Sequence, residues 1–182
     1  MNLPNRLSLI RIASVPVITL LLVLDNLMWT RYAALFLFIF AAITDFVDGH
    51  IARKYNLVTN FGKFIDPVAD KLLVLSTMIM ISWHGILPAW LVVAVLFREL
   101  AVDGLRLVAV EQGHVIAAGK LGKLKTVCQM MMIIAHLVYF ANFPLLHILA
   151  GWLLIPSQLA VLVMTVWSGA DYFIRNKEVL HG

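Results

Sequence analysis

Long hydrophobic runs, interrupted by short polar stretches, organise this chain. Residues 72–97 and 126–170 contain no Asp, Glu, Lys or Arg. A helix needs about 20 apolar residues to cross the hydrocarbon core of a membrane. The turn-forming stretches HGILP (84–88) and NFPLLH (142–147) divide each of these runs into a hairpin of two helices. The pattern therefore predicts an all-α integral membrane bundle of six transmembrane helices. We place them near residues 7–24, 31–52, 67–83, 87–108, 122–141 and 147–173.

Composition supports this interpretation. Of the 182 residues, 62% are hydrophobic and 13% are charged, and the mean hydropathy is +0.94. The charged share is about half that of a typical soluble domain. We expect a single membrane domain over residues 1–182. Residues 1–24 are expected to be a retained first helix and not a cleaved signal peptide, because no small-residue cleavage pattern follows them. Residues 1–10 are expected to form a short N-terminal interfacial segment.

The distribution of basic residues predicts the orientation. If six helices alternate, every Lys and Arg except Arg31 falls on one side of the membrane. The positive-inside rule then places both termini and the two long loops in the cytoplasm. The net charge of +4 is thus concentrated on one face, where it can also contact anionic lipid headgroups. We expect a multi-pass protein of a bacterial cytoplasmic membrane, with no nucleic-acid partner.

Two kinds of site are excluded by residue counts and spacing. The single cysteine, Cys128, rules out an internal disulfide and a cysteine-based zinc cluster. The six histidines form no HxxxH or HExxH pair, so the sequence does not indicate a zinc site.

Four aspartates lie at the predicted cytoplasmic ends of the second and third helices. Asp45 and Asp48 are three residues apart, and Asp66 and Asp70 are four apart, so each pair shares one helix face. Pro67 suits a first helical position, which would make Asp66 the N-cap of the third helix. A connection of about a dozen residues can bring the two pairs together. The spacing therefore predicts four carboxylates that converge at the membrane surface.

Four ionised carboxylates cannot lie together without cations, since like charges at close range disfavour ionisation. Their hard oxygen ligands suit Mg²⁺ or Mn²⁺, and shared carboxylates can bridge two ions, the arrangement used for displacement at phosphorus. Taken singly, each acid can instead be a helix cap or half of a salt bridge. Acids near a membrane core are costly and usually functional, which favours the metal interpretation for the set.

The aspartates belong to a longer pattern, Asp45-x2-Asp48-Gly49-x2-Ala52-Arg53-x8-Gly62-x3-Asp66-x3-Asp70. This pattern resembles the signature of the CDP-alcohol phosphatidyltransferase family, and every fixed position of that signature is present. The resemblance implies that the four aspartates bind a pair of divalent cations, Mg²⁺ or Mn²⁺, and that Asp70 is the general base. It also implies a homodimer and a CDP-diacylglycerol donor. The implied donor-binding residues are Asp48, Gly49, Ala52, Arg53 and Gly62.

A site at the membrane surface suits such a donor, because its acyl chains stay in the bilayer while its nucleotide diphosphate stays in water. Metal ions there would stabilise charge on the departing CMP. Asp70 would take the proton of an acceptor hydroxyl as that oxygen attacks the β-phosphorus. We see no separate candidate for a covalent nucleophile, so a single displacement is expected.

The acceptor is suggested by a second polar stretch, residues 98–126. It is rich in basic residues, which favour an anionic acceptor such as sn-glycerol 3-phosphate over serine or free inositol. A run of similar residues in bacterial members of the family that use this acceptor supports the choice. By this analogy we assign the acceptor phosphate to Arg98, Arg106, Lys123 and Lys125. Arg11 is a weaker candidate. Alternatively, these bases only set the topology or pair with Glu99 and Asp103.

The leading hypothesis is therefore an enzyme that converts CDP-diacylglycerol and sn-glycerol 3-phosphate to phosphatidylglycerol phosphate and CMP. One alternative keeps the chemistry and changes the acceptor, as in a cardiolipin synthase or an inositol-phosphate enzyme. A second is a divalent-cation transporter, which predicts acids near the bilayer midplane and broken helices. A third is a lipid-binding protein without chemistry, which leaves the aspartate spacing unexplained.

Overall fold

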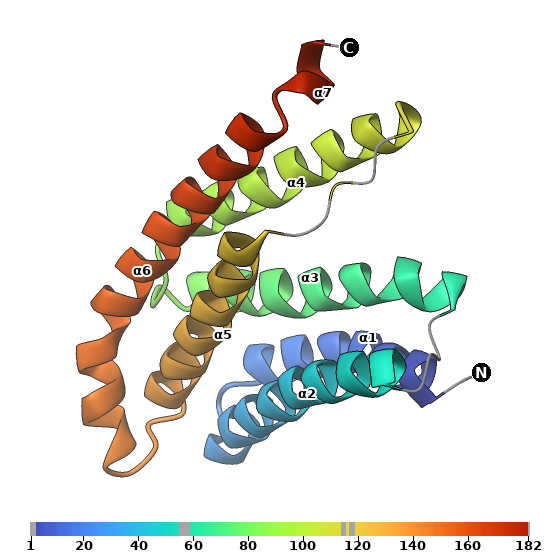
Figure 1. The fold of residues 1–182 in the computed structure, drawn as a ribbon. Coiled ribbons are helices and arrows are strands. Elements are labelled where there is room, and N and C mark those ends of the chain that lie inside the picture. The colour runs from blue at the N-terminus through green and yellow to red at the C-terminus, as the bar shows by residue number, and fades with distance from the viewer. Residues whose placement is uncertain (1–2, 55–58, 114–115, 117–118, 182) are drawn as a thin grey trace.

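The computed structural model describes residues 3–54, 59–113, 116 and 119–181, and within these ranges the chain is helical, with no strand (Figure 1). Six long helices are followed by one short helix. They are α1 (Leu3–Val23), α2 (Met28–Lys54), α3 (Asn60–Trp83), α4 (Ala89–Glu111), α5 (Lys120–Phe140), α6 (Leu146–Arg175) and α7 (Glu178–His181). The predicted all-α fold is confirmed. Residues 1–10 do not form a separate segment in the described part of the chain, because α1 runs unbroken from Leu3.

The two predicted hairpin turns are confirmed. The HGILP stretch lies between α3 and α4, where Gly85 adopts a φ of +74° that favours glycine. The NFPLLH stretch joins α5 to α6, and Asn142 and Leu145 have positive φ angles there. Both turns lie at the same end of the molecule as the α1–α2 turn (Figure 1). The opposite end carries both chain termini, and we call it the terminal end.

The predicted start of the third helix was wrong. The helix begins at Asn60, and its N-cap is Thr59, whose hydroxyl accepts a hydrogen bond from the Gly62 backbone N–H at 2.9 Å. Asp66 and Pro67 therefore lie inside α3 and do not cap it. Threonine is itself a good N-cap. The two extra turns pack against α1, and this packing outweighs the loss of the one backbone N–H donor that Pro67 lacks.

The helices form two groups that share one core. The first helix packs closely against both α2 and α3, which touch each other at few positions. On the other side α5 and α6 form a tight antiparallel hairpin, and α4 lies across α6 (Figure 1). Fully buried apolar side chains from α2, α3, α4 and α5 join the groups, including Phe38, Met78, Leu91 and Ile133. The core holds together the parts of α3, α4, α5 and α6 that lie toward the terminal end of the molecule, and a pocket lies among them.

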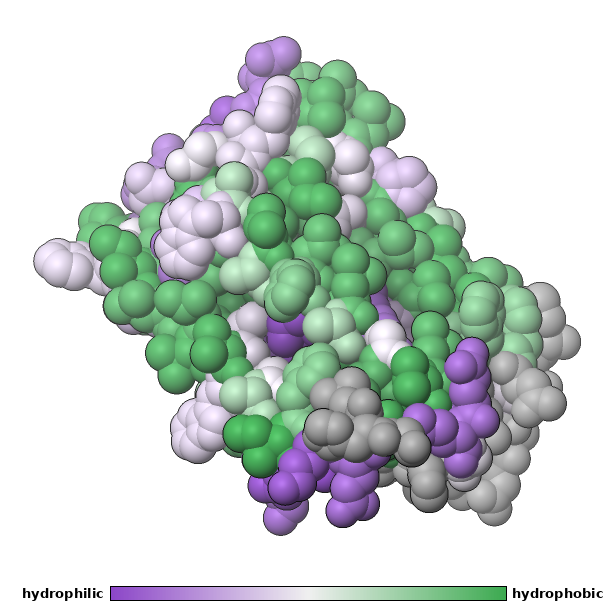
Figure 2. Space-filling model, turned by 90° about the horizontal axis from the view of Figure 1, so that it is seen from above, coloured by the Kyte–Doolittle hydropathy of each residue, from purple (hydrophilic) through white to green (hydrophobic). Residues whose placement is uncertain are grey.

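The surface of the protein is strongly apolar. Phe97 and Trp152 are 74% and 78% exposed, and hydrophobic residues cover most of the face shown in Figure 2. Such extensive exposed apolar surface indicates contact with lipid or with another protein. Three helices, α1, α5 and α6, are long and apolar enough to cross a membrane. Each of α3 and α4 carries several charged residues in its terminal half, and six of these line the pocket: Asp70, Lys71, Arg98, Glu99, Asp103 and Arg106.

Candidate active site

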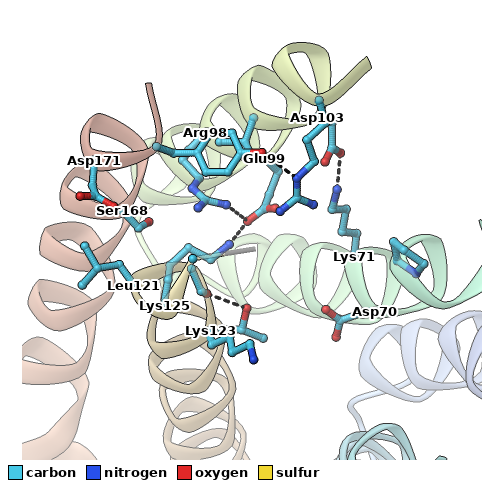
Figure 3. A pocket seen from close by; sticks show the side chains of 17 residues that line it. Asp70, Lys71, Arg98, Glu99, Asp103, Leu121, Lys123, Lys125, Ser168 and Asp171 are labelled. Carbon is cyan, nitrogen blue, oxygen red and sulfur yellow. Dashed lines mark hydrogen bonds and ion pairs between the residues drawn. The ribbon is translucent and has the colours of Figure 1, made fainter. Parts of the chain in front are cut away.

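A pocket of about 230 Å³ opens among the terminal ends of α3, α4, α5 and α6 (Figure 3). Five basic and four acidic side chains line it. The basic residues are Lys71, Arg98, Arg106, Lys123 and Lys125, and the acidic residues are Asp70, Glu99, Asp103 and Asp171. The structure thus brings together all four residues predicted to bind the acceptor phosphate, and it places Asp70 in the same wall. Their functional roles remain predictions.

The floor of the pocket is held by a buried ion pair between α4 and α5. The Lys125 ammonium contacts the Glu99 carboxylate, and both side chains are almost fully buried. The Arg98 guanidinium lies 3.6 Å from the same Glu99 oxygen. Two cations therefore share one carboxylate in a site of low water content. Removing either partner of a buried pair is costly, so this cluster fixes the distance between α4 and α5.

A second ion pair closes the pocket on the α3 side. The Lys71 ammonium contacts the Asp103 carboxylate and thereby ties α3 to α4 (Figure 3). On α6, Asp171 accepts a hydrogen bond from Arg175 at 2.7 Å, one helical turn away. The pairing of Asp171 with Arg175 is the one that their sequence spacing predicts. Three of the four pocket acids, Glu99, Asp103 and Asp171, are thus engaged by bases.

Arg106 and Lys123 differ from the other bases of the pocket. Among the described residues, neither forms an ion pair with a carboxylate. The Arg106 Nε instead donates a hydrogen bond to the Tyr172 hydroxyl at 3.0 Å, and its guanidinium lies 5.5 Å from the centre of that ring. Lys123 is exposed at the mouth of the pocket. Their positive charge is available to an anion, which is the property that an acceptor-phosphate site requires.

Glycines on α5 and α6 allow these two helices to approach Arg98 of α4 closely. A Cβ atom at Gly169 would lie 3.3 Å from Arg98 Cγ, and one at Gly122 would lie 3.7 Å from Arg98 Nη2. The first distance is tighter than most Cβ contacts, so a side chain at position 169 would require the Arg98 stem to shift by a few tenths of an ångström. Arg98 and Lys125 both pair with Glu99, as the alternative interpretation of these bases predicts. This pairing does not exclude an anion site beside them.

The four aspartates are described only in part. Asp70 is half-buried and lines the pocket, and Asp66 lies one turn before it on α3, where its Oδ1 accepts a hydrogen bond from Ser8. The two carboxylates offer hard oxygen ligands on one helix face, which fits Mg²⁺ or Mn²⁺. Asp45 and Asp48 lie on α2, but their side chains are outside the described residues. Among the side chains that are described, no group of three or more His, Cys, Asp or Glu residues is arranged to hold a metal. The four-carboxylate site stays a prediction.

The predicted donor-binding residues are also only partly described. Gly49, Ala52 and Arg53 belong to the last turns of α2, and the side chains there lie outside the described part of the chain. Gly62 is buried near the start of α3, where a Cβ atom would lie 3.0 Å from Asn5 Oδ1. A side chain at position 62 would therefore require the Asn5 side chain to shift, whatever Gly62 contributes to donor binding. Arg11 is fully buried on α1 and is not among the described residues that line the pocket.

Several pocket residues were missed by sequence reasoning. Tyr172 and Ser168 come from α6, about 70 residues beyond Arg98, and no local pattern links them to the site. Lys71 and Asp103 were not assigned to the site, although each lies on the same helix as an assigned residue. A search for polar positions one turn apart on the last helix would have marked Ser168, Asp171 and Tyr172 together.

The fold and this pocket define a helical membrane protein with a polar, cation-rich site at one end of its bundle. Comparisons with known proteins agree with this class of protein and identify the family within it. The family model for CDP-alcohol phosphatidyltransferase matches residues 1–167, and the chain belongs to this family.

Named relatives cover most of the chain. It is 42% identical to the CDP-diacylglycerol–glycerol-3-phosphate 3-phosphatidyltransferase of Bacillus subtilis (strain 168), over 98% of this chain and 97% of that protein. It is 40% identical to the probable phosphatidylglycerophosphate synthase of Mycobacterium tuberculosis (strain H37Rv), over 96% of this chain and 81% of that protein. It is 46% identical to the Rickettsia typhi protein with the same name as the Bacillus relative, over 71% of this chain and 72% of that protein. The predicted family is confirmed.

Proposed function

We propose that this protein transfers the phosphatidyl group of CDP-diacylglycerol to sn-glycerol 3-phosphate, which gives phosphatidylglycerol phosphate and CMP. One observation carries the proposal: a carboxylate of the family signature, Asp70, lines the same pocket as two bases, Arg106 and Lys123, that have no carboxylate partner among the described residues. An acceptor with both a hydroxyl and a phosphate fits a pocket with these two features. The names of the relatives support the same reaction.

In the proposed reaction, Arg106 and Lys123 bind the acceptor phosphate, and Lys125 and Arg98 add positive potential from the floor of the pocket. This contact orients the acceptor hydroxyl toward Asp70. Asp70 takes the hydroxyl proton while the oxygen attacks the β-phosphorus of the donor. The bond between the β-phosphorus and the bridging oxygen breaks, and that oxygen leaves with CMP. No covalent enzyme intermediate forms.

Asp45, Asp48, Asp66 and Asp70 are the residues proposed to hold two divalent cations, Mg²⁺ or Mn²⁺. When bound there, the cations would offset the negative charge of the diphosphate and of the leaving CMP. Arg53 is proposed to bind the diphosphate, and Gly49, Ala52 and Gly62 are proposed to leave room for the nucleotide. These assignments rest on the positions of the four residues in the signature.

We also propose that all six long helices cross a bacterial cytoplasmic membrane, with the terminal end in the cytoplasm and the protein a homodimer. The charges of α3 and α4 then lie near the cytoplasmic surface, beside a water-soluble acceptor. Cys128 can be replaced by serine to give a cysteine-free chain. A cysteine placed at Asn176 should then react with a membrane-impermeant maleimide only from the cytoplasmic side, and one at Asn142 only from the other side.

The reaction is tested by CMP release from purified protein in detergent micelles containing CDP-diacylglycerol and Mg²⁺. Acceptors to compare are sn-glycerol 3-phosphate, glycerol, myo-inositol phosphate and phosphatidylglycerol, with an EDTA control. Release that requires sn-glycerol 3-phosphate and is abolished by EDTA supports the proposal. Release with another acceptor would keep the chemistry and reject the acceptor assignment. Absence of release with every acceptor would reject the enzymatic proposal and leave cation transport as the next hypothesis to measure.

A further inference from the structure

Buried polar side chains form a stripe that winds around α1, a helix that is otherwise largely apolar. Its residues recur at every third position and are each 6% exposed or less: Asn5, Ser8, Arg11 and Ser14. Residues three apart are neighbours on a helix surface, so consecutive members of the stripe lie next to one another, and the stripe turns about halfway round the helix between Asn5 and Ser14. Polar groups buried in a membrane helix are costly and are usually retained for a function. The proposed reaction uses none of these side chains, so the stripe needs another explanation.

The stripe faces the two helices that carry the aspartates. The helix α1 packs closely against both α2 and α3, whereas α2 and α3 make few contacts with each other. Figure 1 shows α1 and α2 side by side beneath α3. The spacing between the two aspartate-bearing helices is therefore set mainly through α1.

Two polar contacts join the stripe to the start of α3. The Ser8 hydroxyl donates a hydrogen bond to Oδ1 of Asp66. The Thr59 hydroxyl, which caps α3, donates to Oδ1 of Asn5 at 3.0 Å and accepts from the Gly62 N–H at 2.9 Å. A chain of hydrogen bonds thus runs from the α3 backbone through its cap to α1.

The approach of α1 to α3 is close because residue 62 lacks a side chain. A Cβ atom there would lie 3.0 Å from Asn5 Oδ1 and 3.2 Å from Thr59 Oγ1, and both atoms are held in hydrogen bonds. A side chain at this position would push both atoms aside and strain the hydrogen bonds that they form. The geometry of the Ser8–Asp66 contact therefore depends on glycine at position 62.

We propose that Ser8 is a positioning residue for the metal-binding carboxylate Asp66, and that Asn5 fixes the start of α3 so that this contact forms. The inference rests on the proposed function, in which Asp66 binds a divalent cation. Ser8 has one donor, and its bond to Oδ1 sets the orientation of the carboxylate and thus the direction of Oδ2. Partners that orient a metal ligand affect metal affinity by about 10- to 100-fold.

The test measures Mn²⁺ binding directly, by electron paramagnetic resonance of the purified full-length protein with CDP-diacylglycerol and no acceptor. We expect Ser8→Ala to weaken Mn²⁺ binding by about 10-fold or more. In the assay, the Mg²⁺ concentration for half-maximal rate should rise by a similar factor while KM for the acceptor stays unchanged. The matched control is Ser14→Ala, because the Ser14 hydroxyl donates only to the Arg11 carbonyl of its own helix at 2.6 Å. This control should bind Mn²⁺ like the unmodified protein.

Asp66→Asn distinguishes a failure of the positioning role of Ser8 from a failure of the metal assignment of Asp66. If Asp66→Asn weakens Mn²⁺ binding and Ser8→Ala does not, the positioning role is rejected and the proposed metal site stands. If Asp66→Asn leaves Mn²⁺ binding unchanged, the metal assignment fails and the inference fails with it. Equal losses in Ser8→Ala and Ser14→Ala would show a general packing effect on α1 and would also reject the role of Ser8. Thermal unfolding of each variant without metal checks that the bundle is intact.

Discussion

Both ends of the bundle contain half-buried charges, but the charges are used differently. At the end opposite the termini, Arg31 donates to the Asp25 carbonyl, lies 3.5 Å from the Asp25 carboxylate and stacks on the Phe140 ring at 4.7 Å. His84 completes this group through the Leu22 carbonyl and the same carboxylate. We call Asp25, Arg31, His84 and Phe140 the Arg31 cluster. Every charge in it faces a protein partner, and it joins α1, α2, α3 and α5.

The terminal end has a different balance. Its pocket contains more bases than acids, and Arg106 and Lys123 have no carboxylate partner among the described residues. Bases without a carboxylate partner leave a positive potential beside the pocket, which favours binding of an anion. The comparison therefore shows that charge alone does not mark a binding site in this protein. A binding site is indicated by charged side chains that have no partner of opposite charge among the described residues and that line a pocket.

The largest effect that this comparison predicts is for Asp70→Asn. Loss of a general base costs roughly 10²–10⁴-fold in rate, and loss of a metal ligand adds to it, so turnover should fall below detection. CMP release and thermal unfolding are measured together, and the variant should remain folded. Asp171→Asn is the matched control, since Asp171 lines the same pocket and pairs with Arg175. A fully active Asp70→Asn protein would remove the base role.

Next in size is Arg106→Ala. Hydrogen bonds to charged groups contribute about 1.5–3 kcal/mol, so KM for sn-glycerol 3-phosphate should rise roughly 10- to 100-fold. KM for CDP-diacylglycerol should change less, because the donor is proposed to bind at the aspartates. Steady-state kinetics with each substrate varied in turn make the measurement. If the donor KM rises more than the acceptor KM, Arg106 does not belong to the acceptor site.

Arg31→Ala makes the same substitution at the opposite end of the bundle. It removes an ion pair, two hydrogen bonds and a ring contact, so we expect a loss of about 1–2 kcal/mol of stability and a lower Tm in detergent. Both KM values should stay unchanged in the folded protein. A changed acceptor KM would show that the Arg31 cluster is coupled to the pocket, and the contrast between the two ends would fail.

The smallest predicted effect is that of Tyr172→Phe. This change removes one hydrogen bond to Arg106 and keeps the ring beneath its guanidinium, a loss of about 0.5–1.5 kcal/mol. The acceptor KM should rise about 2- to 10-fold, with little change in Tm. Tyr139→Phe is the matched control, because Tyr139 stacks on His147 in the last turn of α5, whereas the pocket is lined by residues from the first turns of that helix. An unchanged acceptor KM in Tyr172→Phe would mean that Arg106 needs no orientation by α6.

Features that depend on neighbouring residues were predictable from the sequence. The helical hairpins follow from the HGILP and NFPLLH breaks within long apolar runs. The Asp171–Arg175 pair follows from i,i+4 spacing, and the aspartate pattern is specific because its eight residues lie within 26 positions. The start of α3 was mispredicted because two local capping signals compete, at Thr59 and at Asp66. Contacts of Asp66 with α1 then stabilise the longer helix.

The sequence by itself determined the helical class, the family and the residues that can carry charge at the terminal end. Only the tertiary structure decided which of these charges compensate one another. Glu99 and Lys125 are 26 residues apart, and Arg106 and Tyr172 are 66 apart. No periodicity along the chain encodes such distances, because they depend on how α4 crosses α6 and how α1 fits between α2 and α3. The helical repeat determines which residues of a helix share a face. The packing of the helices determines which residues of other helices that face contacts.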